Sequence, residues 1–227
     1  MTGTRIGIPA ASDDGRLPRR LQDPSVTRGQ IAPTIDPVRH RVYMQGMSAT
    51  ALDTIPILIA PDPILKAKAK PIGRADDAMI RDLAAKMLAT MYLAPGIGLA
   101  APQVGQLLRL ITIDLMPDNK PAPITLINPE IVALADELAS REEGCLSLPG
   151  QYAEVTRPAR CKVRYLDLTG ARREVEADGL LNACLQHEID HLDGILFVDH
   201  LSALKRNIIM RRLAKEQRQK RDDDKRR

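Results

Sequence analysis

The stretch CLQHEIDHLDG, Cys184 to Gly194, sets the interpretation of this sequence. His187 and His191 are four positions apart with Glu188 between them, which is the H-E-x-x-H pattern of a helical metal site. Four residues of α-helix turn through about 400° and rise about 6 Å, so both imidazoles face the same side. We therefore expect both histidines to bind one metal ion, with Glu188 placed to exchange protons with a water at that ion.

Two histidines leave a third ligand to be found. Downstream, Asp193 is too close along the same helix, and His200 is expected at the surface. Upstream, the segment EEGCLSLPG places Cys145 in a tight turn. A thiolate there makes a Cys/His/His set with one position open for water, which is the arrangement of a catalytic metal site. We therefore predict Cys145, His187 and His191 as the metal ligands.

The other two cysteines have simpler interpretations. Cys161 lies on an expected strand and is interpreted as a small buried side chain. Cys184 lies near the metal-binding face of the helix and is expected to form a pocket wall, with a ligand role as the alternative. Three widely spaced cysteines are a poor disulfide framework and fit a reducing compartment.

Hydrophobic periodicity predicts three helices. Residues 76–92 have one apolar face, and residues 179–192 form the helix of the metal motif. A terminal helix is expected from residue 202 to about residue 220. Its short apolar stripe consists of Leu204, Ile208, Ile209 and Leu213.

Short β-branched and apolar runs predict the strands, at residues 107–115, 124–132, 161–168 and 173–177. These runs do not alternate with helices along the chain, so the class is α+β rather than α/β. We expect antiparallel strands packed around the central metal-motif helix, with a further helix at the C-terminus.

The composition is that of one globular domain. The chain has 227 residues, of which 44% are hydrophobic but only 2% aromatic, so aliphatic side chains and methionine must form the core. This composition excludes a disordered protein. No apolar stretch approaches the roughly 18 to 20 residues that a membrane span requires, and no N-terminal run resembles a secretory signal. We therefore expect no membrane partner.

Positive charge is concentrated at the two ends of the chain. Residues 1–46 carry seven arginines against four aspartates and show no periodicity, so we interpret them as a disordered leader. Met44 and Met47 precede the first ordered-looking segment, and we hypothesise that translation begins at one of them, which the intact mass of the native protein tests. A catalytic domain is expected at 47–204. A basic helix and tail follow at 205–227, with eleven lysines and arginines against four acidic residues.

Three short segments together resemble a known family. GIGLAAPQ (96–103), EGCLS (143–147) and QHEIDHL (186–192) are similar to the three signature motifs of peptide deformylases, in the same order and at similar spacings. The resemblance covers roughly residues 55–213 and does not include the leader. It implies a metal-dependent hydrolase that acts during protein biosynthesis. Its substrate would be the N-terminal formyl-methionine of nascent polypeptides, from which it releases formate.

The resemblance also implies roles for individual residues. The metal lowers the pKa of a bound water, and the resulting hydroxide attacks the formyl carbon, with Glu188 as general base and then general acid. The side-chain amide of Gln103 and the backbone N–H of Leu146 match the family's oxyanion donors. Gly96 and Gly98 let the substrate backbone approach closely and pair as an added strand.

One divalent ion is expected. A thiolate with two imidazoles suits Zn(II), Fe(II), Co(II) or Ni(II), and raw affinity favours zinc, whereas the resemblance implies Fe(II) in the cell. Asp190 beside His191, and Glu143 before the cysteine, either orient a ligand or pair with an arginine such as Arg157.

Several alternatives stay open at the level of sequence. The basic end either docks on its own domain or attaches to ribosomal RNA near the exit tunnel, where nascent chains emerge. The bacterial cytoplasm is the expected location, with an organelle as the alternative. Two other functions compete with deformylation: an H-E-x-x-H metallopeptidase whose third ligand lies elsewhere, and a non-catalytic ribosome-associated homologue. The peptidase differs from the deformylase at Cys145, which only the deformylase requires.

Overall fold

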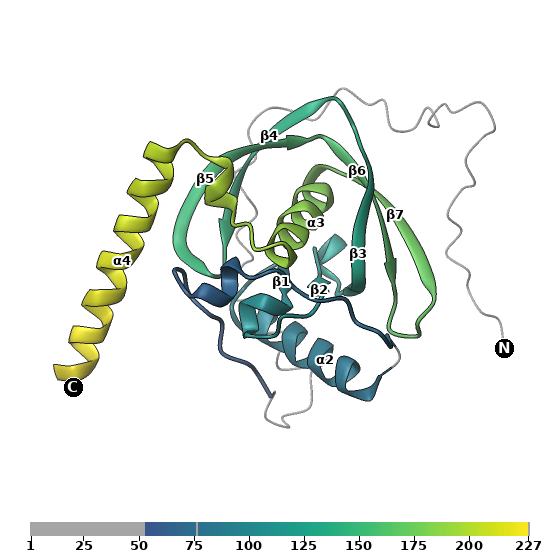
Figure 1. Ribbon diagram of the computed structural model, residues 1–227, viewed down its shortest axis with the longest axis horizontal. Helices are drawn as coiled ribbons and strands as arrows, with labels where there is room; N and C mark the ends of the chain where they lie inside the picture. The colour runs from purple at the N-terminus through teal and green to yellow at the C-terminus, as the bar shows by residue number, and fades with distance from the viewer. Residues whose placement is uncertain (1–52, 76, 227) are drawn as a thin grey trace. The chain divides into compact units, whose positions relative to one another are not determined.

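One helix lies inside an enclosure of strands (Figure 1). The computed structural model describes residues 53–75 and 77–226, so the expected leader and its candidate start codons lie outside the described residues. The enclosed helix is α3 (Gly179–Leu192), which carries the metal motif and has the bounds that the sequence predicts. The α+β class with antiparallel strands and a C-terminal helix is confirmed.

The strands form two separate antiparallel sheets. One has five strands in the order β1-β2-β3-β6-β7, and the other is the hairpin of β4 and β5. Their bounds are β1 (Gly98–Ala100), β2 (Leu110–Ile113), β3 (Ile124–Leu134), β4 (Leu138–Cys145), β5 (Leu148–Pro158), β6 (Arg160–Leu166) and β7 (Arg172–Asp178). The four expected strands correspond to β2, β3, β6 and β7. The other three were not predicted, because β1 is only three residues long and most of β4 is exposed and polar.

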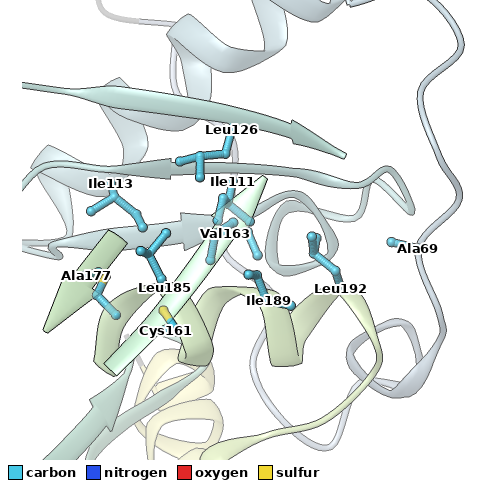
Figure 2. Packing of buried hydrophobic residues seen from close by; sticks show 12 residues of the cluster. Ala69, Ile111, Ile113, Leu126, Cys161, Val163, Ala177, Leu185, Ile189 and Leu192 are labelled. Carbon is cyan, nitrogen blue, oxygen red and sulfur yellow. The ribbon is translucent and has the colours of Figure 1, made fainter. Parts of the chain in front are cut away.

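The first face of the five-stranded sheet packs against α3. Ile111 and Ile113 of β2 point to this face because alternate residues of a strand share one side. Leu185, Ile189 and Leu192 of α3 meet them, as Figure 2 shows. These three leucine and isoleucine side chains follow the helical period, so their burial fixes which side of α3 faces away from the sheet.

The opposite face of the same sheet is covered by α2 (Ala78–Leu93). Leu110 of β2 points to this face, where it shares a buried cluster with Met87 and Met91 of the helix. The helix begins where Asp77 accepts a hydrogen bond from a backbone N–H of the first turn. The sequence predicted this helix with bounds that differ by one or two residues.

The C-terminal helix α4 (Ala203–Arg226) docks at one place along its length. Leu213 is 1% exposed and belongs to the cluster that contains Phe197, whereas Leu204 and Ile208 are 72% and 50% exposed. The apolar stripe is therefore exposed at Leu204 and Ile208 and buried at Leu213, which packs in a cluster with residues of β5 and of the short helix η5 (Phe197–His200). No helix in the described part of the chain is long and apolar enough to cross a membrane.

The docking of α4 predicts a contrast between two leucines of the same helix. Leu213→Ala should lower the free energy of unfolding by about 2–5 kcal/mol, because it empties part of a buried cluster. Leu204→Ala, the matched control, should change it by less than about 0.5 kcal/mol. Urea unfolding followed by circular dichroism measures both. Equal effects would contradict docking through Leu213.

Candidate metal centre

Two imidazoles project from the side of α3 that faces away from the sheet. His187 and His191 are 8% and 1% exposed, and their ring centroids are 4.9 Å apart at an interplanar angle of 80°. Their spacing of one helical turn places them on the same side of the helix. Phe197 of η5 stacks on His187 with 6.3 Å between ring centroids, so apolar side chains back the pair.

Cys145 joins the two histidines from a different element. It is the last residue of β4, directly before the two-residue turn of Leu146 and Ser147. Its Sγ lies 3.2 Å from His191 Nε2. One ligand atom from each of the three side chains lies within 4.8 Å of the others, and this is the one such metal-binding group among residues 53–75 and 77–226. The structure thus brings the three predicted ligands together.

The donor set and its surroundings fit a divalent metal ion. One thiolate and two imidazoles are ligands of zinc and of other first-row metals. Beside them, Glu188 is buried, and its Oε2 has no hydrogen-bond partner among the described residues. Buried polar atoms normally have a partner, so an open carboxylate oxygen next to three ligands fits a centre completed by a metal and its water.

Glu143 orients one of the ligands, a role that the sequence left open. Its Oε2 lies 2.9 Å from His187 Nδ1. Hydrogen bonds from His187 and Arg157 hold the pKa of Glu143 at about 2 even though burial opposes ionisation. An ionised carboxylate only accepts hydrogen bonds, so Nδ1 carries the proton and Nε2 keeps its lone pair for a metal.

Burial sets the charge of the other groups at the centre. It raises the pKa of Glu188 to about 7, close to the value that suits proton transfer at neutral pH. It lowers the pKa of His191 well below the usual range, so this imidazole is neutral. Burial also lowers the pKa of His187, but hydrogen bonds to Cys145 and Glu143 outweigh it and raise that pKa, so metal binding displaces a proton there.

The rejected ligand candidates lie outside the centre. His200 is exposed and its Nε2 is 2.7 Å from Asp190 Oδ2. Asp193 accepts a 2.8 Å hydrogen bond from Arg109. Cys161 is buried in the core on β6.

Cys184 lines the space beside Glu188 rather than joining the ligands. Its Sγ is 3.8 Å from the carbonyl oxygen of Ile97, and burial raises the pKa of its thiol. A neutral thiol is a poor metal ligand, so the position fits the expected pocket wall.

Gln103 presents its amide nitrogen to the centre. It lies on the short helix η3 (Ala101–Val104) and is 1% exposed. Its Oε1 accepts a 2.8 Å hydrogen bond from the backbone N–H of Ala100, which fixes the amide plane. Its Nε2 is therefore directed to Ser147 Oγ at 3.2 Å and to Cys145 Sγ at 3.5 Å.

The two predicted glycines lie where any side chain would collide. A Cβ at Gly96 would meet Leu146 Cδ1 at 2.7 Å. A Cβ at Gly98 would meet Cys184 Sγ at 2.8 Å and the Glu188 carboxylate. Gly98 begins β1, which pairs with β2 alone among the described strands, so that β1 is an edge strand, and Gly98 lies beside Glu188.

Comparison with known proteins gives a consistent result. The sequence model of polypeptide deformylases matches residues 54–207. The peptide deformylase of Mesorhizobium japonicum is 55% identical over 161 residues, which are 70% of this chain and 91% of that protein. The peptide deformylase of Brucella suis is 52% identical over 161 residues, with the same two shares.

Solved structures are similar as well. The peptide deformylase from Legionella pneumophila superposes with a TM-score of 0.69 at 46% identity, covering 74% of this chain and 97% of that one. The peptide deformylase from Synechococcus elongatus, solved in complex with actinonin, gives a TM-score of 0.67 at 44% identity and covers 70% and 88%.

The raised pKa of Glu188 predicts a pH-dependent stability of the metal-free protein. The folded state holds a proton on Glu188 up to a pKa of about 7, against about 4.5 in the unfolded chain. The stability that the protonated group contributes is therefore present below pH 4.5 and is lost as pH rises through 7, by about 3 kcal/mol in all. In free energy of unfolding, metal-free Glu188→Gln should exceed the metal-free wild type by about 3 kcal/mol at pH 8 and differ little from it at pH 4.

Urea unfolding in the presence of a chelator measures this difference. Glu142→Gln is the matched control, because Glu142 is exposed on the same strand as Glu143. A difference between Glu188→Gln and wild type that is equal at both pH values would contradict the buried, proton-holding carboxyl.

Proposed function

The chain belongs to the polypeptide deformylase family, and we propose that its Cys145, His187 and His191 form the centre at which the formyl group of an N-terminal formyl-methionine is hydrolysed. The observation that carries this proposal is the convergence of the three ligand atoms within 4.8 Å beside the unpartnered Glu188 carboxylate. The products are formate and a free α-amino group on the nascent chain.

The three ligands would hold one divalent metal, with Fe(II) as the ion in the cell and Zn, Ni or Co as ions that the same donors accept. When bound, the metal acidifies a water molecule and polarises the formyl carbonyl. Glu143 keeps His187 in the tautomer that such a metal requires, through the 2.9 Å contact to Nδ1.

Glu188 carries the proton. Its carboxylate accepts a proton from the attacking water and returns it to the amide nitrogen as the bond between the formyl carbon and that nitrogen breaks. A pKa of about 7 lets the group do both near neutral pH. Its position one residue after His187 on α3 holds it at the centre without making it a ligand.

Negative charge on the formyl oxygen is stabilised by donors already in place. The Gln103 amide is fixed through Ala100, and the backbone N–H of Leu146 lies in the turn directly after Cys145. Donors that need not reorganise are worth more than donors in water. The open edge of β1 at Gly98 holds the substrate as an added strand.

The two competing functions lose their support. A metallopeptidase would take its third ligand elsewhere, whereas Cys145 lies at the histidines. A non-catalytic homologue is inconsistent with curated relatives at 55% and 52% identity, both named as peptide deformylases. Because the named relatives are bacterial, we propose the bacterial cytoplasm as the location.

Formate release tests the proposal. Wild type loaded anaerobically with Fe(II) should release formate from a formyl-Met peptide. Glu188→Gln should keep the metal but lose about 10²- to 10⁴-fold in kcat, because it cannot exchange the proton. Cys145→Ala should lose both metal and activity, while Cys161→Ala, which removes a thiol from the core, should keep both. Cleavage of internal peptide bonds by Cys145→Ala would indicate the metallopeptidase instead.

The basic helix α4 supplies a surface for ribosomal RNA. Leu213 docks the helix, and Gln217 donates a 2.9 Å hydrogen bond to the carbonyl of Ala60, so truncation before these residues would expose the core. Arg211 and Arg212 are exposed on the docked helix and are the better target. Their charge attracts phosphate in a salt-dependent way.

Charge reversal on α4 tests ribosome attachment. The double variant Arg211→Glu, Arg212→Glu should co-sediment with ribosomes about tenfold more weakly at low salt, with the difference shrinking at high salt. The control is Lys120→Glu, Arg172→Glu, which reverses two exposed charges elsewhere. Equal losses in both variants would mean that only net charge matters, and no loss in either would refute attachment through α4.

A further inference from the structure

A buried arginine connects the two elements that carry the ligands. The Nε and Nη2 atoms of Arg157 on β5 donate to the two carboxylate oxygens of Glu143 on β4, at 2.6 and 3.1 Å. Its Nη1 donates at 2.8 Å to Asp190 on α3. The side chain of Arg157 is 7% exposed, as is that of Glu143, while that of Asp190 is 20% exposed. One guanidinium thus bridges an acid of the hairpin and an acid of the helix.

Both acids lie next to metal ligands. Glu143 is two residues before Cys145 and also contacts His187 Nδ1, while Asp190 directly precedes His191. We propose that Arg157 is a positioning residue: by holding Glu143 and Asp190 together, it fixes the strand that supplies the thiolate against the helix that supplies the imidazoles. This inference rests on the metal centre of the proposed function.

The topology explains why such a connection is needed. Cys145 lies on the two-stranded β4–β5 sheet, whereas α3 packs its apolar side against the five-stranded sheet. The hairpin joins the larger sheet at its base, where Ala135 donates to the Arg160 carbonyl at 3.0 Å and Ala159 donates to the Glu137 carbonyl at 2.7 Å, whereas Cys145 lies at the opposite end of β4. The next residue of β5 also contacts α3, because the Pro158 carbonyl accepts from Asn182 at 2.8 Å and from Gln186 at 3.0 Å.

The chemistry favours positioning over stability. Desolvating a buried ion pair offsets much of its attraction, so apolar residues would hold the two elements together at least as strongly. Apolar contacts are not directional, however, whereas the planar guanidinium fork fixes both distance and angle. A lysine keeps the charge but cannot form the two-oxygen contact with one carboxylate while it binds another.

Replacement of Arg157 by lysine is compatible with the fold. A cavity of about 50 Å³ lies beside Glu143 and Arg157, and such a polar space has room for water next to the shorter side chain. Asp190→Asn is the second variant, because it weakens the helix side of the connection while leaving Glu143 and His187 untouched. Arg109→Lys is the matched control: Arg109 makes a comparable ion pair with Asp193 at the end of α3, away from the ligands.

The test uses the full chain loaded with Co(II). The visible spectrum reports ligand geometry, and the rate of cobalt transfer to a chelator reports retention. We expect Arg157→Lys and Asp190→Asn to lose cobalt about 10- to 100-fold faster than wild type, with shifted ligand-field bands, and Arg109→Lys to match wild type. Thermal unfolding of the metal-free proteins is measured alongside, as a readout of stability alone.

Each result separates the inference from the function on which it rests. A wild type without a thiolate-to-cobalt band would overturn the proposed ligand set itself. A wild type with that band, together with variants that keep cobalt and spectrum unchanged while the unfolding temperature falls, would overturn positioning by Arg157. If Arg157→Lys does not fold, Asp190→Asn decides between the two outcomes.

Discussion

Three ligand atoms from two elements, more than forty residues apart along the chain, must meet within 4.8 Å in a buried space, and the fold is arranged around that requirement. The helix α3 brings two of the ligand atoms together, because His187 and His191 are one turn apart. Packing of Leu185, Ile189 and Leu192 against the sheet (Figure 2) leaves both rings on the far side of the helix. The hairpin supplies the third ligand atom, because β4 ends at Cys145.

Burial shifts the pKa of Glu188 and also makes the charge of Glu143 unfavourable unless it is paired. Removing Glu188 from water raises its pKa to about 7, which suits the proton transfer that we propose for it. The same burial would leave the Glu143 charge unfavourable without Arg157, because an ion in a medium of low dielectric needs a partner. Glu143 is therefore ionised while Glu188 can hold a proton in the same buried region, because Arg157 contacts Glu143 directly.

The parts of the structure that the sequence predicts are those with a strong local signal. The bounds of α3 follow from helical periodicity, and the ligands follow from residue type and order. The sequence did not predict β4 because its exposed, charged residues lack the alternation of a half-buried strand. It did not predict β5 because two of its buried positions are polar, Gln151 and Arg157. The sequence left open whether Glu143 and Asp190 orient a ligand or pair with Arg157. The answer depends on the register of the hairpin and on where the hairpin meets α3. Periodicity indicates the apolar face of α4 but not how much of that face is covered, so the exposure of Leu204 and Ile208 could not be predicted.

The contacts of Gln103 are compatible with the oxyanion role that we propose for it. Its carbonyl oxygen is held by Ala100, and one amide hydrogen is directed to Ser147 Oγ, so those two contacts fix the plane of the group. The remaining hydrogen lies toward Cys145 Sγ at 3.5 Å, and sulfur is a weak acceptor. In the proposed reaction that hydrogen is available to the developing oxyanion, because the interaction that it gives up is weak. The contacts with Ala100 and Ser147 therefore orient the amide, and the weak contact with Cys145 leaves one N–H available as a donor.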